Sequence, residues 1–143
     1  MATITAASTL AFSLSTLEVA LRHISAYGFQ KVELSDQVTH SQHFGVDSVD
    51  PTEVRRQLAR HSLEPVAVNA CILAVFDTGR WSHARLPVEA QSAAETEQIR
   101  EAKKRLIFLK LHEPEQAAVY VDRAQRLVDK AQATGIPRVC LQG

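Results

Sequence analysis

One pattern occurs three times along the chain, and it constrains the fold more than any other feature. A small residue is followed by an apolar residue, two variable residues, valine, any residue and a second apolar residue. Residues 28–34, 62–68 and 135–141 have this pattern. In residues 28–34 it describes a helix that ends and a strand that begins, so the repetition predicts three helix-to-strand junctions. Such a repeat is typical of a parallel α/β protein.

The first helix is predicted before the first junction, after a short strand at residues 3–7. Ser15 and Glu18 have the Ser-x-x-Glu spacing of a capping box. Apolar residues then recur at intervals of three and four, and they are Leu17, Ala20, Leu21 and Ile24. Gly28 is expected to end this helix, because glycine readily takes the left-handed conformation of a helix terminus.

The strand after Gly28, residues 31–34, alternates apolar and polar residues. Because successive side chains of a strand point to opposite faces, Val32 and Leu34 are expected to pack under helices. Glu33 and Ser35 then point to the other face, toward the centre of the sheet.

A second helix is predicted to start at Asp50, which is followed by proline and, two residues later, by Glu53. Aspartate is a good N-cap, and proline suits the first helical position. Val54 and Leu58 are its expected inward residues. The third strand, residues 65–70, is almost continuously apolar, as in strands that are buried on both faces.

Residues 72–113 form a long excursion in this interpretation. Residues 72–91 are expected to be a loop, and residues 92–111 a helix with a buried stripe. That stripe consists of Ile99, Ala102, Leu106 and Leu109. A further helix begins at Pro114, with a second stripe at intervals of four and three, namely Ala117, Val121, Ala124, Val128 and Ala131. The last strand is predicted at residues 138–141.

The resulting order of elements is β-α-β-α-β-α-α-β. Right-handed crossovers between neighbouring strands give about four parallel strands with the helices outside, which is the first half of a (β/α)8 TIM-barrel-like fold. We therefore expect residues 1–143 to be one partial barrel domain, since a whole barrel takes ~250 residues. Its exposed strand edges predict possible self-association.

Charge and hydropathy exclude several classes of partner. The chain has 16 basic and 16 acidic residues, so its formal net charge is zero. Nucleic acids and anionic membranes are therefore not expected as partners. No run approaches the ~20 apolar residues of a membrane span, and no secretory signal is visible, so a soluble cytoplasmic protein is expected. Cys71 and Cys140 are expected to be free and buried.

Three segments together resemble the sugar phosphate isomerase/epimerase family, whose members have a xylose isomerase-like barrel. The segments are residues 17–34, with Ala-Tyr-Gly-Phe followed by Lys-Val-Glu-Leu, residues 51–68, and residues 131–143. In the last of these, glycine, valine and glycine at positions 135, 139 and 143 match the family's fourth strand in outline.

This resemblance implies a metal-assisted proton transfer next to a carbonyl group of a sugar or cyclitol, with Mn, Mg, Co or Zn as cofactor. The family's principal metal-binding carboxylates lie on later strands, so the resemblance implies a chain truncated before them and no metal ligands within it. A dehydratase of the same family and a non-catalytic small α/β binding or regulatory module remain alternatives. Related barrels that act on abasic DNA have histidine ligands where this chain has Asn69 and Gln142, which argues against the nuclease branch.

The candidate site residues follow from these strand ends. Glu33 is the candidate catalytic carboxylate, with an ordinary bond to backbone or to a basic side chain as its alternative role. The candidates for substrate binding are Ser35, Asn69, Trp81, His83 and Gln142. Trp81 is equally interpreted as covering exposed core. His40 and His43 have a His-x-x-His spacing, but they fall in a predicted loop, and we do not assign them a metal.

Overall fold

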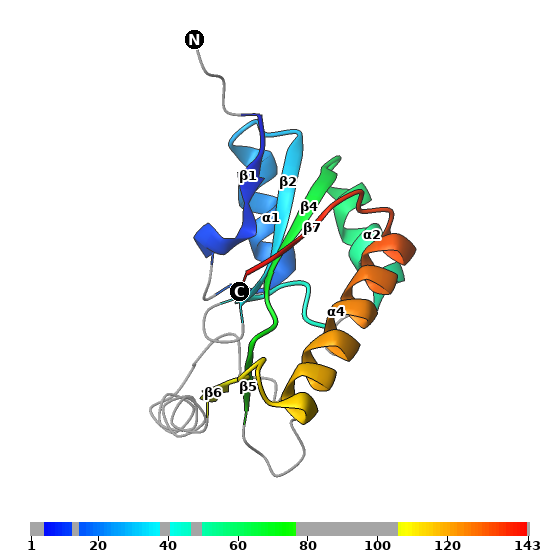
Figure 1. The fold of residues 1–143 in the computed structure, drawn as a ribbon. Coiled ribbons are helices and arrows are strands. Elements are labelled where there is room, and N and C mark those ends of the chain that lie inside the picture. Colours follow the sequence, from blue (N-terminus) through cyan, green and yellow to red (C-terminus); the bar gives the residue numbers. More distant parts are fainter. Residues whose placement is uncertain (1–4, 13–14, 38–40, 47–49, 77–105, 143) are drawn as a thin grey trace.

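The computed structural model describes residues 5–12, 15–37, 41–46, 50–76 and 106–142. Its main sheet has parallel strands in the order β1 (Ala7–Ser8), β2 (Lys31–Gln37), β4 (Glu64–Cys71) and β7 (Val139–Leu141) (Figure 1). A short strand, β3 (Ser41–Gln42), pairs antiparallel with β2. The predicted parallel α/β arrangement, with strands added in chain order, is confirmed.

In the described part of the chain, three α-helices and one 3-10 helix accompany this sheet. They are η1 (Thr9–Phe12), α1 (Leu17–Ala26), α2 (Pro51–Arg60) and α4 (Pro114–Thr134). Helix α2 contacts both α1 and α4, so the three helices lie in a row in the same order as the strands. Among the described residues, no helix is long and apolar enough to cross a membrane.

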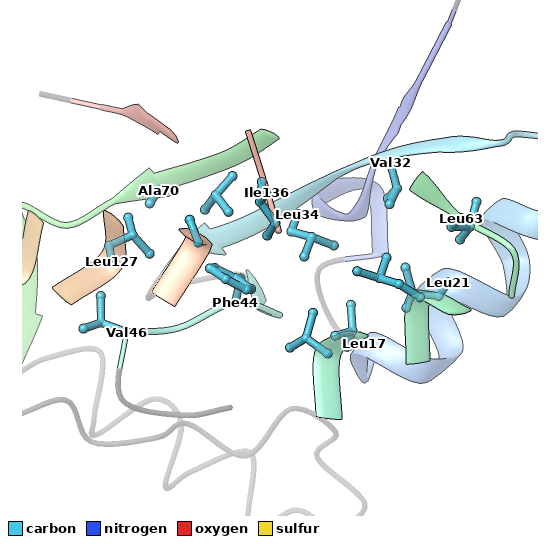
Figure 2. Packing of buried hydrophobic residues seen from close by; sticks show 14 of the residues in the cluster. Leu17, Leu21, Val32, Leu34, Phe44, Val46, Leu63, Ala70, Leu127 and Ile136 are labelled. Carbon is cyan, nitrogen blue, oxygen red and sulfur yellow. The ribbon is translucent and has the colours of Figure 1, made fainter. Parts of the chain in front are cut away.

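The hydrophobic core lies between the sheet and this row of helices (Figure 2). Val32 and Leu34 of β2 are fully buried in it, together with Val68 of β4. From the helices it receives Leu17, Leu21, Ile24, Val54, Leu58, Leu127 and Ala131. The predicted alternation of β2 is therefore confirmed. Glu33 and Ser35 point to the opposite face of the sheet.

A β-bulge adjusts the pairing of β2 with β4. Val32 pairs with Pro65, whereas Glu33 pairs with Ala67, so Val66 is an extra residue in β4. Proline has no N–H to donate to a strand ladder and is tolerated at bulges.

The predicted starts of α1 and α2 are both found, the first shifted by one residue. Thr16, rather than Ser15, is the N-cap of α1, and its side chain accepts a hydrogen bond from the Val19 N–H. Asp50 caps α2 as predicted, and its carboxylate accepts from the Thr52 N–H at 2.7 Å.

The three predicted junctions share one backbone feature. Gly28, Ser62 and Gly135 all have a positive φ, of 86°, 53° and 82°. At the second junction the Leu63 N–H donates to the Leu58 carbonyl at 3.0 Å, the bond that closes a helix end of this kind. Ser62 therefore adopts a conformation in which a non-glycine residue is strained.

The prediction of a helix over residues 92–111 is wrong where the structure describes this segment. Strand β6 (Leu106–Phe108) pairs antiparallel with β5 (Ala74–Phe76). Isoleucine and phenylalanine, the residues at positions 107 and 108, are enriched in strands. Their backbone forms hydrogen bonds with β5, a partner that the spacing of apolar residues could not reveal.

The buried face of α4 also differs from the predicted stripe. Val121 and Val128 are exposed, and Ala117 and Ala124 are half-buried. Of the predicted stripe, Ala131 is buried, and the other buried residues are Arg123, Leu127, Lys130 and Thr134. Two long cationic side chains share the inward face, and apolar spacing alone could not indicate that.

Replacing Ser62 with glycine should raise the free energy of unfolding by about 1 kcal/mol, because it removes the strain of the left-handed conformation. Chemical denaturation of the Ser62→Gly variant measures this gain. The control is Ser62→Ala, which keeps the Cβ and should leave stability nearly unchanged. Equal stability of the glycine and alanine variants would contradict the account of this helix end.

Candidate functional site

The face of the sheet opposite the helices carries polar side chains near the carboxyl ends of the strands. Ser35 pairs with Asn69 on β4, and Asn69 pairs with Cys140 on β7. One step further along the strands, Gln37 pairs with Cys71. Because paired residues of neighbouring strands point to the same face, these side chains form one surface, which we call the polar face.

Ser35 and Asn69 are the centre of this polar face. Ser35 is fully buried, and Asn69 is half-buried. Within the described part of the chain, the Ser35 Oγ and the Asn69 Oδ1 are shielded from solvent and have no hydrogen-bond partner. Leaving a buried polar atom without a partner costs ~1–3 kcal/mol. Two neighbouring buried atoms that both lack a hydrogen-bond partner are typical of a place where a ligand supplies the missing bonds.

The backbone of Ser35 is held from two sides. Its N–H donates to the Thr9 Oγ1 at 2.9 Å, and its carbonyl accepts from the Phe44 N–H at 3.2 Å. Thr9 is fully buried at the start of η1. These two bonds fix the backbone of Ser35. The position of the Ser35 hydroxyl is therefore set by the strand and not by a loop.

Gln37 and Gln142 connect the two sides of the polar face. The Gln37 Nε2 donates to the Gln142 Oε1 at 2.9 Å, and the Gln142 N–H donates to the Ala70 carbonyl at 2.9 Å. Gln142 therefore lies on the predicted face. Gln37 is a residue that the sequence analysis missed, although continuing the alternation of β2 by two residues would have placed it here.

Glu33 lies on the same face, two residues before Ser35 and opposite Ala67. It is half-buried. Two residues of a strand span ~6.6 Å, so Glu33 stands one step away from the Ser35–Asn69 pair toward the amino ends of the strands. Trp81, His83 and His40 lie outside the described residues.

Both cysteines are free, and they are less buried than expected. Cys71 is half-buried and Cys140 is exposed. Burial was expected because free cysteines are usually buried, but β7 lies at the edge of the described sheet, and Cys140 pairs with Asn69 on the face away from the helices.

His43 is a buried residue that connects its own turn to the start of α1. It is almost fully buried, and its Nε2 lies 2.7 Å from the Ser15 carbonyl. Burial lowers the pKa of His43 below its ordinary value, and the bond to Ser15 opposes this shift only partly. A ring nitrogen bonded to a carbonyl carries the proton and is not a metal ligand.

The donor set for the implied divalent metal is not present in this part of the chain. Among the described residues, no three side chains of His, Cys, Asp or Glu are grouped so that they could hold a metal ion. On the polar face, Glu33 would be accompanied by amides and a hydroxyl. These residues do not fit a metal site.

Buried cations of α4 fix the turns beside the polar face. The Lys130 Nζ donates to the Gly45 carbonyl at 2.5 Å and lies 5.2 Å from the centre of the Phe44 ring. The Arg123 Nε donates to the Ile72 carbonyl at 3.1 Å. Gly45 follows β3 and Ile72 follows β4, so these bonds attach α4 to the residues that follow these two strands.

A shallow depression of about 450 Å³ lies at the other end of the sheet, lined by Gly28, Phe29, His61, Ser62 and Glu64 among others. It is remote from the polar face, because its residues precede β2 and β4 or begin β4. The carboxyl-end polar face remains the better candidate on chemical grounds, since it has buried polar atoms without partners.

Three side chains near this depression have the residue types of a hydrolase triad. The His61 Nε2 lies 2.9 Å from the Glu18 Oε1, and this bond is the main cause that lowers the pKa of Glu18. However, the Ser25 Oγ donates to the main-chain carbonyl of His61 at 3.0 Å. The hydroxyl is thus not activated by the imidazole, and the three residues connect α1 to α2.

Comparisons of the chain with protein-family models, with curated proteins and with solved structures find no match.

The pKa of His43 predicts a loss of stability on acidification. Since the folded state holds its pKa below the unfolded value of 6.5, the unfolded chain binds the proton first as pH falls. The stability due to neutral His43 is therefore complete above pH 6.5 and decreases below it.

We expect His43→Gln, which can still donate to the Ser15 carbonyl, to lose less stability than the natural chain between about pH 7.5 and about pH 5. Urea denaturation at both pH values measures the difference. Equal losses in the two proteins would contradict the buried, neutral His43.

Proposed function

We propose that the polar face binds the hydroxyl groups of a sugar or cyclitol, and that the chain belongs to an isomerase or epimerase built on a (β/α)8-type barrel. The observation that carries the proposal is the pair of Ser35 and Asn69, whose buried Oγ and Oδ1 atoms lack partners within the described residues. A hydroxyl group both donates and accepts, so a polyol can satisfy the serine and the amide together.

The position of the polar face supports this choice of ligand. In α/β proteins with parallel strands, ligands bind at the carboxyl ends of the strands. Ser35, Asn69 and Gln142 all lie there, and they are amides and a hydroxyl rather than charged groups. A neutral ligand with several hydroxyls suits this surface better than a phosphate or a nucleic acid does.

The barrel itself is part of the proposal. Parallel strands in chain order with one row of helices are the arrangement of successive βα units in such a barrel. Within it, Glu33 would be the carboxylate that moves a proton next to a carbonyl, because it shares the face with the polyol-binding pair.

The non-catalytic binding module is the second candidate. It is favoured by the composition of the polar face, where the described residues around Ser35 and Asn69 carry amides and thiols rather than carboxylates. Deuterium incorporation from D₂O at the carbon next to the carbonyl of a bound ketose distinguishes the two. An isomerase incorporates deuterium in a manner that depends on Glu33, whereas a binding module does not.

NMR titration with a panel of aldoses, ketoses and inositols tests polyol binding. The amide signals of Ser35, Asn69 and Gln142 should shift with the ligand that binds. Ser35→Ala and Asn69→Ala should each weaken binding about tenfold, the effect of losing one net hydrogen bond of ~1–1.5 kcal/mol.

Ser25→Ala is the matched control, because it removes a hydroxyl at the opposite end of the sheet and should leave the affinity unchanged. If only the amide signals of Phe29, Gln30 and Ser62 shifted, the ligand would bind in the depression, which would contradict the proposal. Absence of any shift across the panel would also contradict it.

A further inference from the structure

The bond between Gln37 and Gln142 crosses a whole strand. Gln37 belongs to β2, Gln142 follows β7, and β4 lies between these two strands. The register places Cys71 of β4 beside Gln37. On the other side of β4, the Gln142 N–H donates to the Ala70 carbonyl, so Gln142 is next to Cys71 as well. The two glutamine side chains therefore meet across β4 at Cys71, and we call their 2.9 Å hydrogen bond the amide bridge.

The amide bridge and the pair of Ser35 and Asn69 are two successive levels of the polar face. Gln37 comes two residues after Ser35, and Cys71 comes two residues after Asn69. Residues that are two apart in a strand point to the same face and are separated by ~6.6 Å. The amide bridge is therefore one step from the pair, toward the carboxyl ends of the strands. Ligands of parallel sheets bind at that edge.

The two amides retain groups for further hydrogen bonds. The Gln37 Nε2 uses one N–H for the Gln142 Oε1, whereas an amide group has two N–H donors and an acceptor oxygen. Within the described part of the chain, the structure shows no side-chain partner for the Gln37 Oε1 or for the Gln142 Nε2. The amide bridge thus offers an acceptor and donors together, and a hydroxyl group can both donate to the one and accept from the other.

The backbone holds the amide bridge at both ends. Gln37 is the last residue of β2, and it pairs with Ser41 of β3. Gln142 is bonded to β4 through its own N–H. The hydrogen bond between the two side chains also limits the conformations that each can take. A ligand that binds to groups already in place loses less conformational entropy in ordering them.

We propose that the amide bridge is a second contact point for the ligand and selects polyols by their length, an inference that rests on the proposed function of the polar face. A hydroxyl at one end of the ligand bonds to Ser35 and Asn69. A hydroxyl at the other end bonds to the amides of Gln37 and Gln142. A six-membered polyol ring with hydroxyls on opposite carbons spans the step between the two levels, whereas a three-carbon polyol reaches only one of them.

Cys71 reports on where the ligand lies. It is half-buried, and it is the residue of β4 between the two glutamines of the amide bridge. A ring that extends from Asn69 to the amide bridge covers this thiol. A short polyol bound only to Ser35 and Asn69 leaves it uncovered. The alkylation rate of Cys71 therefore measures the position of the ligand independently of its affinity.

NMR titration with myo-inositol and with glycerol tests the selection by length. Gln37→Ala and Gln142→Ala should each weaken the binding of myo-inositol about tenfold, the effect of losing one hydrogen bond, and should leave the binding of glycerol unchanged. Gln37→Asn keeps an amide that is too short to bond to Gln142, so it should behave like Gln37→Ala. The matched control is Gln132→Ala, which removes an exposed amide from α4, on the other side of the sheet. It should bind both ligands like the natural chain.

Alkylation with iodoacetamide, followed at each cysteine by mass spectrometry, is a second test that needs no variant. Saturating myo-inositol should slow the alkylation of Cys71, and saturating glycerol should not. Equal affinity of the natural chain and Gln37→Ala for myo-inositol, or no protection of Cys71 by bound myo-inositol, overturns the role of the amide bridge and leaves polyol binding at Ser35 and Asn69 intact. If neither ligand shifts any amide signal, the proposed function fails, and this inference fails with it.

Discussion

The parallel pairing of β2 with β4 is the interaction on which the rest of the structure depends. It sets Leu34 beside Val68 on the face that the helices cover, and Ser35 beside Asn69 on the other. A shift of one residue would exchange the two faces and expose the core. The hydrophobic burial of Val32, Leu34 and Val68 thus stabilises the same register that presents the polar pair. Core and candidate site are two consequences of one pairing.

Helix α4 forms hydrogen bonds to the turns that follow the strands. Lys130 and Arg123 are buried, and burial of a cation is costly unless it is paired or hydrogen-bonded. Their bonds to the carbonyls of Gly45 and Ile72 compensate part of that cost and hold the residues that follow β3 and β4 in place. The polar face is therefore supported by the core helix that lies behind it.

Local signals in the sequence predicted much of this fold. The N-cap Asp50, the left-handed Gly28 and the alternation through Leu34 are decided by neighbouring residues, and all three are confirmed. Strand β6 depends on a partner about thirty residues away, and the buried cations of α4 depend on carbonyls in distant turns. The bond between Gln37 and Gln142 likewise joins residues far apart in the chain. Local patterns carry no information about such partners.

The central claim, that Ser35, Asn69 and Cys140 share the face away from the helices, is tested most directly by nuclear Overhauser effects from the Asn69 side-chain amide. The account predicts contacts of this amide with the β-protons of Ser35 and Cys140, its paired neighbours. Contacts with the methyl groups of Val54 or Leu58 on α2 would instead place Asn69 in the core, and would contradict both the register and the candidate site.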